Sequence, residues 1–522
     1  MVFASPFPDV ATVDEPVHVH VLSGAAARGD HPALIDAGSG ETVTYAELAG
    51  SVERLAAGFA EAGLRKGDVL ALHSPNSVLF PVVLFAASRL GVVVTTLNAL
   101  STAGELATQL ADARARLVVT VSALLPAAVA AAAQAGVEEV LVCDTAEGHR
   151  SVQELLASTA PVPEVPIDVD NDLFVLPYSS GTTARPKGVM LCHRSVATNM
   201  DQVHAAWTEI GPDTRAIAVL PFFHIFGMAM LFDFLSRGAT LVVLPRFDLK
   251  QFLAGIAEYR VNRLIVVPPI VLGMAKHPAV DDYDLSSLTM VFSAAAPLDP
   301  DLAGACAARL GVPVVQGYGM TELSPGTHLV PDGETDPAPG TVGKLLPGTR
   351  ARLVDPETGV DVGADEVGEL LISGPQVMKG YFGQPEETDA AIDADGWLHT
   401  GDLASVDDRG NWFIVDRVKE LIKYKGYQVP PAELEAVLLS HPGIADTAVI
   451  GRYNADGDEE PVAFVVPTPG AGLTAESVKA YVAERVAPYR KVRQVEFVDA
   501  IPRATSGKIL RRELRQRPPS AM

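Results

Sequence analysis

The sequence predicts an α/β fold, with a large N-terminal domain of parallel-type sheets flanked by helices, a β-rich subdomain, and a small α+β C-terminal domain. In the first half, short runs of Val, Leu and Ile alternate with helical patterns, which is typical of parallel strands covered on both faces. After about Pro325, glycine and proline become dense and short strands separated by turns follow. The chain of 522 residues is also too long for a single hydrophobic core.

Capping and spacing predict the elements of the first half. Thr44 and Glu47 form a capping-box pattern, and apolar residues then recur at helical spacing. The apolar stretch from Val78 to Leu97 is interrupted by proline, serine and arginine. We therefore expect a buried helix followed by a strand, because a membrane span needs about 20 nearly uninterrupted apolar residues. The alanine-rich residues 127–135 predict another packed helix. The expected strands cover residues 68–72, 91–95, 115–120, 139–142, 216–220, 240–244 and 263–267.

The second half predicts two smaller units. Strands expected at 351–354, 369–372 and 412–415 form the β-rich subdomain. A helix then begins near residues 430–431, because proline is tolerated in a first turn. Strands at 447–450 and 461–466 and a helix at 476–486 complete a compact α+β unit. The predicted domains are residues 1–416, with the subdomain at about 326–416, and residues 417–522.

Composition excludes several classes of function. Forty Lys and Arg against 64 Asp and Glu give a net charge of −24, which is wrong for a general binder of nucleic acids or anionic membranes. The three scattered cysteines form no C-x-x-C pair, which argues against disulfides and a cysteine-rich zinc site and fits a reducing compartment. Residues 1–10 lack the pattern of a signal peptide. We expect a soluble, cytoplasmic protein.

A loop rich in hydroxyl groups and glycine follows the apolar residues 173–176. It spans residues 178–188 and reads Y-S-S-G-T-T-A-R-P-K-G. Backbone N–H groups and one lysine in such a loop can wrap and neutralise a phosphate. It is not the P-loop pattern G-x-x-x-x-G-K-[ST], because Lys187 stands between Pro186 and Gly188. Taken alone, the loop is more typical of a flexible surface segment.

Five further motifs follow this loop along the chain. They are Q-G-Y-G-M-T-E at 316–322, T-G-D at 400–402, D-R-V-K-E at 416–420, K-Y-K-G-Y at 423–427 and P-R-A-T-S-G-K at 502–508. Together with the loop, and in this order, they resemble the adenylate-forming superfamily of acyl-CoA synthetases, firefly luciferase and adenylation domains of peptide synthetases. The resemblance covers nearly the whole chain. Residues 220–227 and 415–431 are most similar to bacterial 4-coumarate–CoA ligases.

The resemblance implies a site for ATP and Mg²⁺. The hydroxyl-rich loop would hold the β- and γ-phosphates, and Thr321 would contact the α-phosphate. Asp402 and Arg417 would hold the ribose hydroxyls, where an isolated pair would otherwise be interpreted as a surface ion pair. Glu322 would bind Mg²⁺, because a carboxylate suits a hard cation. The implied ATP/AMP residues are Ser179, Ser180, Gly181, Thr182, Thr183, Lys187, Ala296, Gln316, Gly317, Tyr318, Thr321, Asp402, Arg417, Lys419, Lys423 and Lys508.

The resemblance also implies a two-step reaction that uses CoA. Lys508 would carry the first step, because its cation offsets the repulsion between a substrate carboxylate and the α-phosphate. The C-terminal domain would then turn about Lys419 and bring residues 423–427 to the thiol. His224 would gate the thiol path, although a lone histidine in an apolar run is usually a core residue. The implied catalytic residues are Lys508, His224, Thr321 and Lys419, and the implied CoA contacts are Arg246, Lys425 and Gly426.

The implied acid pocket is apolar and carries an aromatic ring, which suits an aryl acid such as cinnamate or 4-coumarate. Phe226 stands where the plant ligases commonly carry tyrosine, so plain cinnamate suits the pocket equally well. A medium- or long-chain fatty acid is the main alternative, because an apolar tunnel discriminates poorly against it. The phosphate loop carries Ala184 where glycine is usual. The pocket residues are Ile225, Phe226, Ala229, Phe292, Ala294, Ala295, Gly317, Gly319, Pro325, Gly326 and Thr327.

Three functions are compatible with these motifs: an acid–CoA ligase, an enzyme that loads a carrier protein, and a nucleotide-binding sensor. Arg246 and Lys425 favour free CoA as the thiol. The presence of Lys508, Glu322, Asp402 and Lys419 together argues against a sensor, since binding alone requires no mobile lysine. We therefore expect a small carboxylic acid, ATP and CoA as partners, with no nucleic acid and no membrane insertion.

Overall fold

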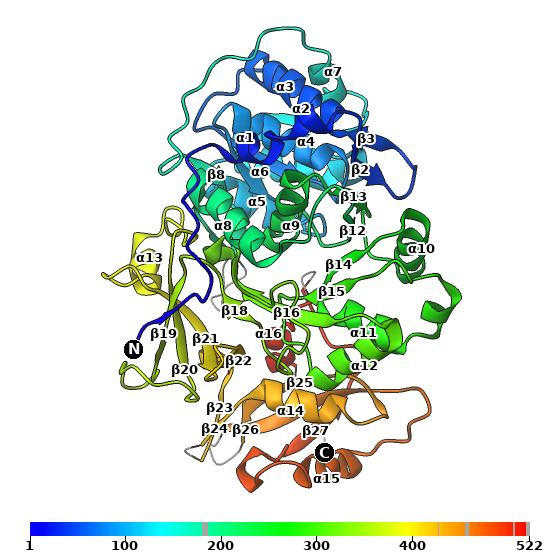
Figure 1. Ribbon diagram of the computed structural model, residues 1–522, viewed down its shortest axis with the longest axis vertical. Coiled ribbons are helices and arrows are strands. Elements are labelled where there is room, and N and C mark those ends of the chain that lie inside the picture. The colour runs from blue at the N-terminus through cyan, green and yellow to red at the C-terminus, as the bar shows by residue number, and fades with distance from the viewer. Residues whose placement is uncertain (180–185, 426, 455–458, 505–506, 518–522) are drawn as a thin grey trace.

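The computed structural model describes residues 1–179, 186–425, 427–454, 459–504 and 507–517 (Figure 1). Three sheets and their helices form a large body from the N-terminal four fifths of the chain. Most of the C-terminal elements lie beneath it in the view of Figure 1. This arrangement confirms the predicted α/β class.

A six-stranded sheet forms the upper part of the body. All neighbouring strands pair in parallel except β11, which pairs with β8 in the antiparallel sense. The order across the sheet is β11 (Leu191–Cys192), β8 (Leu173–Val175), β5 (Val93–Thr96), β4 (Val69–His73), β6 (Leu117–Thr120) and β7 (Glu139–Val142). The four strands predicted here are thus confirmed.

Helices flank this sheet, and three of them lie where the sequence predicted helices. The Thr44 side chain accepts a hydrogen bond from the Glu47 backbone N–H, and this capping box begins α3. The apolar stretch after Val78 forms a buried helix and then β5, as expected. The helices of this region are α1 (Val17–Leu22), α2 (Ala25–Arg28), α3 (Tyr45–Glu61), α4 (Leu79–Arg89), α5 (Ala103–Asp112), α6 (Leu125–Ala135) and α7 (Val152–Leu156).

A nine-stranded sheet crosses the middle of the body. Its strands from β16 to β2 run parallel, and the strands at both edges are antiparallel. The order is β18 (Lys344–Leu345), β17 (Gly326–Leu329), β16 (Val314–Gly319), β15 (Met290–Ser293), β14 (Arg263–Val266), β12 (Arg215–Ala218), β13 (Thr240–Val243), β2 (Pro32–Asp36) and β3 (Thr42–Thr44). The associated helices are α8 (His193–Ala206), α9 (Ile225–Ser236), α10 (Leu249–Tyr259), α11 (Pro268–Lys276) and α12 (Pro300–Leu310).

A five-stranded antiparallel sheet contains the predicted β-rich segment. The N-terminal strand β1 joins its edge, although it lies more than 340 residues away in the chain. Conversely, β17 and β18 extend the nine-stranded sheet. The order is β1 (Phe3–Ala4), β19 (Arg350–Val354), β20 (Gly368–Ser373), β21 (Leu398–Val406) and β22 (Trp412–Arg417).

The C-terminal elements have hydrophobic clusters of their own. Buried residues between Ile422 and Leu514 form these clusters, whereas the large cluster of the body ends at Trp412. This separation supports the boundary predicted near residue 416, which stays a prediction. The elements are β23 (Ile422–Tyr424), β24 (Tyr427–Val429), α14 (Pro431–Leu439), β25 (Ile444–Tyr453), β26 (Glu459–Pro467), α15 (Ala475–Ala483), β27 (Gln494–Phe497) and α16 (Arg511–Arg515).

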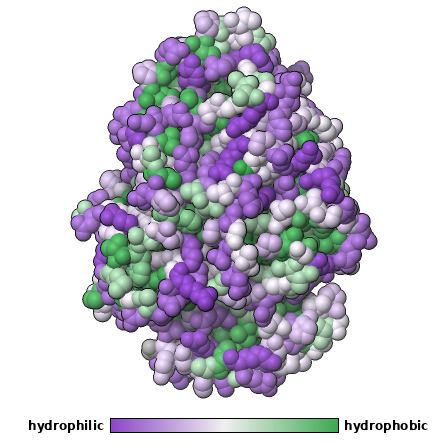
Figure 2. Space-filling model, in the orientation of Figure 1, coloured by the Kyte–Doolittle hydropathy of each residue, from purple (hydrophilic) through white to green (hydrophobic). Residues whose placement is uncertain are grey.

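The face shown in Figure 2 is mainly hydrophilic, with scattered hydrophobic residues, as expected for a strongly charged chain. Among the residues that the structure describes, no helix is long and apolar enough to cross a membrane. The cysteines Cys143, Cys192 and Cys306 are buried and free.

Candidate active site

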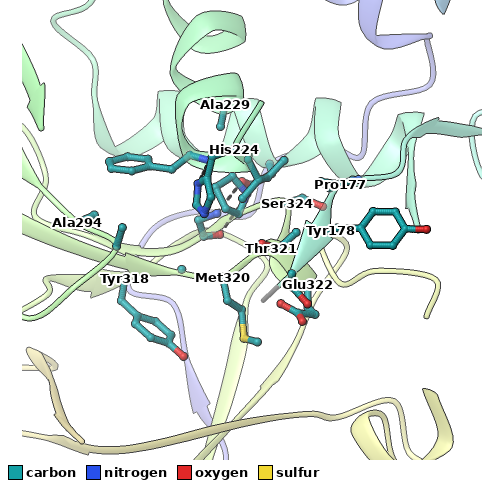
Figure 3. Close-up of a pocket in the computed structure, with 18 of the residues that line it drawn as sticks. Pro177, Tyr178, His224, Ala229, Ala294, Tyr318, Met320, Thr321, Glu322 and Ser324 are labelled. Carbon is teal, nitrogen blue, oxygen red and sulfur yellow. Dashed lines mark hydrogen bonds between the residues drawn. The ribbon is translucent and has the colours of Figure 1, made fainter. Parts of the chain in front are cut away.

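A cavity of about 690 Å³ lies where the nine-stranded sheet, α9 and the C-terminal segment meet (Figure 3). Segments that follow the carboxyl ends of β15 and β16 line it, which is where α/β sheets usually bind ligands. Most of the predicted site residues meet here. They are Ser179, Lys187, His224, Ile225, Phe226, Ala229, Phe292, Ala294, Ala295, Gly317, Tyr318, Gly319, Thr321, Glu322, Pro325, Gly326, Arg417, Lys419 and Lys508.

Other predicted residues do not line this cavity. The Gln316 side chain accepts a hydrogen bond from the Leu298 backbone N–H, and Asp402 lies behind Tyr318. The remaining residues in this group are Ala296, Arg246, Thr327, Lys423 and Lys425. Ser180, Gly181, Thr182, Thr183, Ala184 and Gly426 fall outside the described residues.

The two ends of the phosphate loop form a short hairpin. In it, β9 (Tyr178–Ser179) and β10 (Lys187–Gly188) pair so that Ser179 is opposite Lys187. The buried Ser179 hydroxyl has no hydrogen-bond partner among the described residues. Lys187 forms an ion pair with Glu387 of α13 (Pro385–Ala391), and its Nζ lies 4.7 Å from the ring centroid of Tyr381. A buried hydroxyl and an ammonium group are therefore held side by side at one wall of the cavity.

Glu322 provides a buried carboxylate close to this hairpin. It lies in the short helix η3 (Thr321–Leu323), directly after β16, and is 5% exposed. The Tyr381 hydroxyl donates a hydrogen bond to Glu322 Oε1 over 3.0 Å. Within the described part of the chain, no group of three or more His, Cys, Asp or Glu residues is arranged to hold a metal ion. A cation here would therefore depend on oxygen ligands supplied by a nucleotide and water.

Tyr318 and Arg417 line the opposite wall, and Asp402 holds both of them from behind. Asp402 on β21 is directly opposite Arg417 on β22, and Arg417 Nε lies 2.9 Å from Asp402 Oδ1. The Tyr318 hydroxyl donates to Asp402 Oδ2 over 2.6 Å. Burial lowers the pKa of Arg417, but Asp402 and the other acidic groups around it together outweigh this effect and raise the pKa. Burial, together with Asp402, raises the pKa of Tyr318. The Arg417 guanidinium is therefore fixed in place as a cation.

His224 and Lys508 face the cavity from different domains. His224 caps α9, and its Nδ1 accepts a hydrogen bond from the Phe226 backbone N–H over 3.3 Å. Burial, with the charge of Lys508, lowers the pKa of His224 to about 4. The imidazole is therefore neutral at pH 7 and carries its proton on Nε2. Burial, followed by the charge of Arg417, lowers the pKa of Lys508 to about 8, so Lys508 is mostly a cation at pH 7.

The segment that carries Lys508 is seated against the body. The Lys508 carbonyl accepts a hydrogen bond from the Ala504 N–H over 2.8 Å. Gly507 has a φ of +82°, and a Cβ built there would lie 3.3 Å from Pro269 of α11. Ala504 and Lys508 both line the cavity. The described C-terminal residues thus deliver a lysine to the site.

The acid pocket is walled by rings and backbone. Phe226 and Phe292 form an edge-to-face pair with centroids 6.1 Å apart, and Trp207 lies edge-on to Phe292 at 4.7 Å. The absence of a side chain at Gly317 leaves room for the Phe292 ring, because a Cβ at Gly317 would lie 2.5 Å from that ring. A Cβ at Gly319 would lie 2.1 Å from the Pro325 carbonyl oxygen, so glycine is required there.

Sequence reasoning missed the wall of the cavity that α8 forms with α9. These helices pack against each other, and residues of both line the cavity; Figure 3 shows Ala229 on α9, the helix that His224 caps. The α8 residues recur at helical spacing, which is the signal that could have identified this wall. The missed residues are Val196, Asn199, Met200, Val203, Trp207, Met230 and Asp233.

Comparison with known proteins identifies the family. The AMP-binding enzyme model matches residues 23–382, and the AMP-binding enzyme C-terminal domain model matches residues 433–508. The 4-coumarate–CoA ligase 5 of Oryza sativa subsp. japonica is 44% identical over 98% of this chain and 97% of its own length. The 4-coumarate–CoA ligase 1 of Petroselinum crispum is 39% identical over 99% of this chain and 97% of its own length.

Solved structures agree with this family. ATP-bound MatB from Rhodopseudomonas palustris has a TM-score of 0.87 at 31% identity, covering 96% of this chain and 99% of its own. A benzoate CoA ligase from Burkholderia xenovorans LB400 has a TM-score of 0.87 at 26% identity, covering 96% of this chain and 100% of its own. The predicted resemblance is confirmed, and the chain belongs to the AMP-binding family of adenylate-forming enzymes.

Proposed function

We propose that this enzyme activates a cinnamate-type aryl acid with ATP to an acyl adenylate and then transfers the acyl group to CoA. The observation that carries the proposal is the shape of one cavity. At one end it holds Lys187, Glu322 and Arg417 for a nucleotide. At the other it holds an apolar slot walled by Phe226 and Phe292. The relatives named 4-coumarate–CoA ligase support the same acid class.

In the first step a carboxylate oxygen bonds to the α-phosphorus, and the bond to the β-phosphate oxygen breaks to release pyrophosphate. Both reactants are anionic, so a cation between them lowers the barrier. Lys508 supports this role because its segment is docked in the cavity beside His224 and Arg417. Neutral His224 can donate from Nε2 to the carboxylate without adding charge.

A magnesium ion fits the nucleotide end. Mg²⁺ usually takes one or two protein carboxylates and completes its ligands with water and substrate phosphates. Glu322 meets this requirement because it is buried, lines the cavity and is held by Tyr381. When bound, Mg²⁺ would neutralise phosphate charge, and Glu322 would orient it. Removal of divalent cations with EDTA should abolish pyrophosphate release, and Glu322→Gln should raise the Mg²⁺ concentration that restores it.

The second step requires a rearrangement of the C-terminal segment. The thiolate of CoA attacks the acyl carbonyl, and AMP leaves with the electron pair of the broken C–O bond. Lys423, Lys425 and Arg246 are exposed and lie outside the cavity, while Lys508 occupies it. This arrangement supports a conformation suited to adenylation. Rotation of the C-terminal segment about Lys419 would then remove Lys508 from the cavity and bring residues 423–427 to it. A thioester step with no Lys508 requirement would support that exchange.

A fatty acyl-CoA synthetase is the second candidate, because the acid pocket has further apolar walls. Met200, Val203 and Trp207 also line the cavity. An apolar pocket of this kind discriminates poorly against an alkyl chain.

The test is a pyrophosphate-release assay with ATP and Mg²⁺, in which cinnamate, 4-coumarate, octanoate, palmitate and phenylalanine are each tried with and without CoA. We expect CoA-dependent turnover and thioester formation with the cinnamates. Preference for the fatty acids would replace the aryl substrate by the second candidate. An acyl adenylate that does not react with CoA would indicate that the acceptor thiol belongs to a carrier protein. Absence of pyrophosphate release with every acid would contradict the ligase function.

A further inference from the structure

We propose that Tyr381 is a positioning residue that couples the binding of Mg²⁺ to the binding of ATP. Its hydroxyl holds the carboxylate of Glu322, and its ring holds the ammonium group of Lys187. This inference rests on the proposed ATP-dependent function and concerns the nucleotide end of the same cavity. None of the sequence motifs contains Tyr381, although the residue lines the cavity.

The backbone on either side of Tyr381 joins the two segments that carry these charges. The Met378 N–H donates to the Glu322 carbonyl oxygen, in η3, over 2.9 Å. The Phe382 N–H donates to the Gly188 carbonyl oxygen, in β10, over 2.8 Å. This five-residue stretch therefore ties the short helix of the carboxylate to the hairpin strand of the lysine.

Helix α13 fixes the backbone of Tyr381 in turn. The Tyr381 N–H donates to the Thr388 hydroxyl over 2.9 Å, and that hydroxyl donates to the Gln384 carbonyl oxygen over 3.0 Å. Gly380 has a φ of +132°, and a Cβ built there would lie 2.5 Å from the Thr388 side chain. Glycine therefore permits this close approach, and Tyr381 extends from a rigid anchor toward the cavity.

The side chain of Tyr381 contacts both charged groups at once. Its hydroxyl donates to Glu322 Oε1 over 3.0 Å, and its ring centroid lies 4.7 Å from Lys187 Nζ. Glu322 is 5% exposed and the Lys187 side chain 13% exposed, so solvent weakens neither contact much. One ring therefore fixes a carboxylate and an ammonium group relative to each other.

Glu387 of α13 also holds Lys187, but through a contact of a different kind. The Glu387 side chain is 47% exposed, so water screens this ion pair. A nucleotide phosphate is an anion and competes directly with the Glu387 carboxylate for the lysine. The uncharged ring of Tyr381 does not compete with the phosphate. The contact with Tyr381 is therefore the one that can persist when a nucleotide binds.

This arrangement would link the metal to the phosphates. Mg²⁺ demands a strict ligand geometry, and loss of a group that orients a ligating side chain typically lowers metal affinity about 10–100-fold. The Tyr381 hydroxyl is such a group for Glu322. Loss of this hydroxyl should therefore weaken the response to Mg²⁺ and leave the metal-free affinity for the nucleotide nearly unchanged.

The experiment measures nucleotide binding, so it needs neither acid nor CoA. Calorimetry gives the dissociation constant of α,β-methylene-ATP, which cannot release pyrophosphate, in EDTA and over a series of Mg²⁺ concentrations. In Tyr381→Phe we expect the Mg²⁺ concentration for half of the affinity gain to rise about tenfold or more. The dissociation constant in EDTA should stay within about twofold of the wild type. An unchanged Mg²⁺ requirement in the folded variant would overturn the proposal.

A second variant tests the ring. Tyr381→Leu should show the same loss of Mg²⁺ response, and its dissociation constant in EDTA should also rise about threefold, because Lys187 loses the ring. Tyr453→Phe changes an exposed tyrosine of β25 and is the matched control. The melting temperature establishes that each variant is folded. Equal constants for both Tyr381 variants in EDTA would contradict the contribution of the ring.

A double-mutant cycle shows whether Tyr381 acts through Glu322. Glu322→Gln alone should raise the Mg²⁺ requirement of nucleotide binding. Addition of Tyr381→Phe should then raise it by less than about twofold, since the carboxylate that the hydroxyl orients is already absent. Two effects that multiply would contradict the proposed route through Glu322.

The two proposals fail in different ways. If no acid yields pyrophosphate or a thioester but Tyr381→Phe still shifts the Mg²⁺ requirement of nucleotide binding, the ligase function fails and the role of Tyr381 stands. If cinnamate is converted to its thioester while Tyr381→Phe keeps the wild-type Mg²⁺ requirement, the ligase stands and the role of Tyr381 fails. A wild-type enzyme that does not bind the nucleotide would overturn both.

Discussion

The nucleotide end and the acyl end of the cavity are built in different ways. The nucleotide end collects charged and hydroxyl side chains from short motifs far apart in the chain, such as Lys187, Arg417 and Lys508. The acyl end is formed by side chains of α8 and α9 together with Phe292 of β15 and Gly317 of β16. Charged groups need particular residue types at particular points, but an apolar wall accepts many side chains of suitable volume. Sequence motifs therefore identify the residues of the nucleotide end, whereas tertiary packing decides which residues form the acyl end.

The same contrast appears in how each end is fixed. At the nucleotide end Arg417 is held by Asp402, which in turn is held by Tyr318. At the acyl end the Phe292 ring packs against Trp207 and Phe226 and occupies the space left by the absence of a side chain at Gly317. Ion pairs and hydrogen bonds orient the charged groups that act in the reaction, whereas side-chain packing sets the length and width of the acid that fits. Substitutions at the two ends should accordingly affect different steps and substrates.

The largest effect is expected from Lys508→Ala. Loss of the cation should slow adenylate formation by at least about 100-fold, because this charge acts where the two anions approach. Transfer from a supplied acyl adenylate to CoA should be far less affected. Pyrophosphate release and thioester formation from that adenylate measure the two steps separately.

Lys250→Ala is the matched control for this variant, because Lys250 is an exposed residue of α10 outside the cavity. An equal loss in both steps would contradict the assignment of Lys508 to the first one.

Filling the acid pocket from the side of α8 should change which acid is used. Val203→Trp places an indole between α8 and α9, where the Val203 side chain would lie 3.6 Å from a Cβ at Gly326. The ratio of kcat/KM for cinnamate over decanoate should rise at least tenfold, with about 1–3 kcal/mol of lost stability from overpacking. Val129→Trp on the partly exposed side of α6 is the control. A constant ratio would show that acids do not enter this part of the pocket.

The pH dependence should distinguish the chemistry of the two steps. The pKa of Lys508 is lowered to about 8, so the cation is present below that pH and is lost above it. Adenylate formation should therefore fall about tenfold between pH 7 and pH 9. The CoA step should not fall in this range, since a higher pH favours the thiolate. A flat profile of pyrophosphate release from pH 7 to pH 9 would contradict this expectation.

The smallest effect is expected in the phosphate loop. Ala184→Gly removes a Cβ from a position where the family usually has glycine. If that position requires a positive φ, alanine costs on the order of 1 kcal/mol, and the KM for ATP should fall about fivefold at most. An unchanged KM would show that alanine is neutral there. We expect the wild-type enzyme to be active in either case.

Periodicity and motifs gave a large part of this structure correctly. The runs of Val, Leu and Ile placed the parallel strands, and Thr44 with Glu47 placed the start of α3. These signals are local, because a capping box or a buried strand requires its residues within a few positions. Partners separated by hundreds of residues leave no such signal, and the pairing of β1 with β19 was not predicted for that reason.

By itself the sequence determined the α/β class, the adenylate-forming family and most of the residues that line the nucleotide end, because phosphate and carboxylate chemistry demand specific side chains. Tertiary structure decided the rest. It brought Lys508 to His224, placed Lys425 and Arg246 outside the cavity, and added Asn199 and Val203 of α8 to the cavity wall. Those relations depend on how helices and domains pack across the whole chain, and packing is set by shape and volume more than by residue pattern.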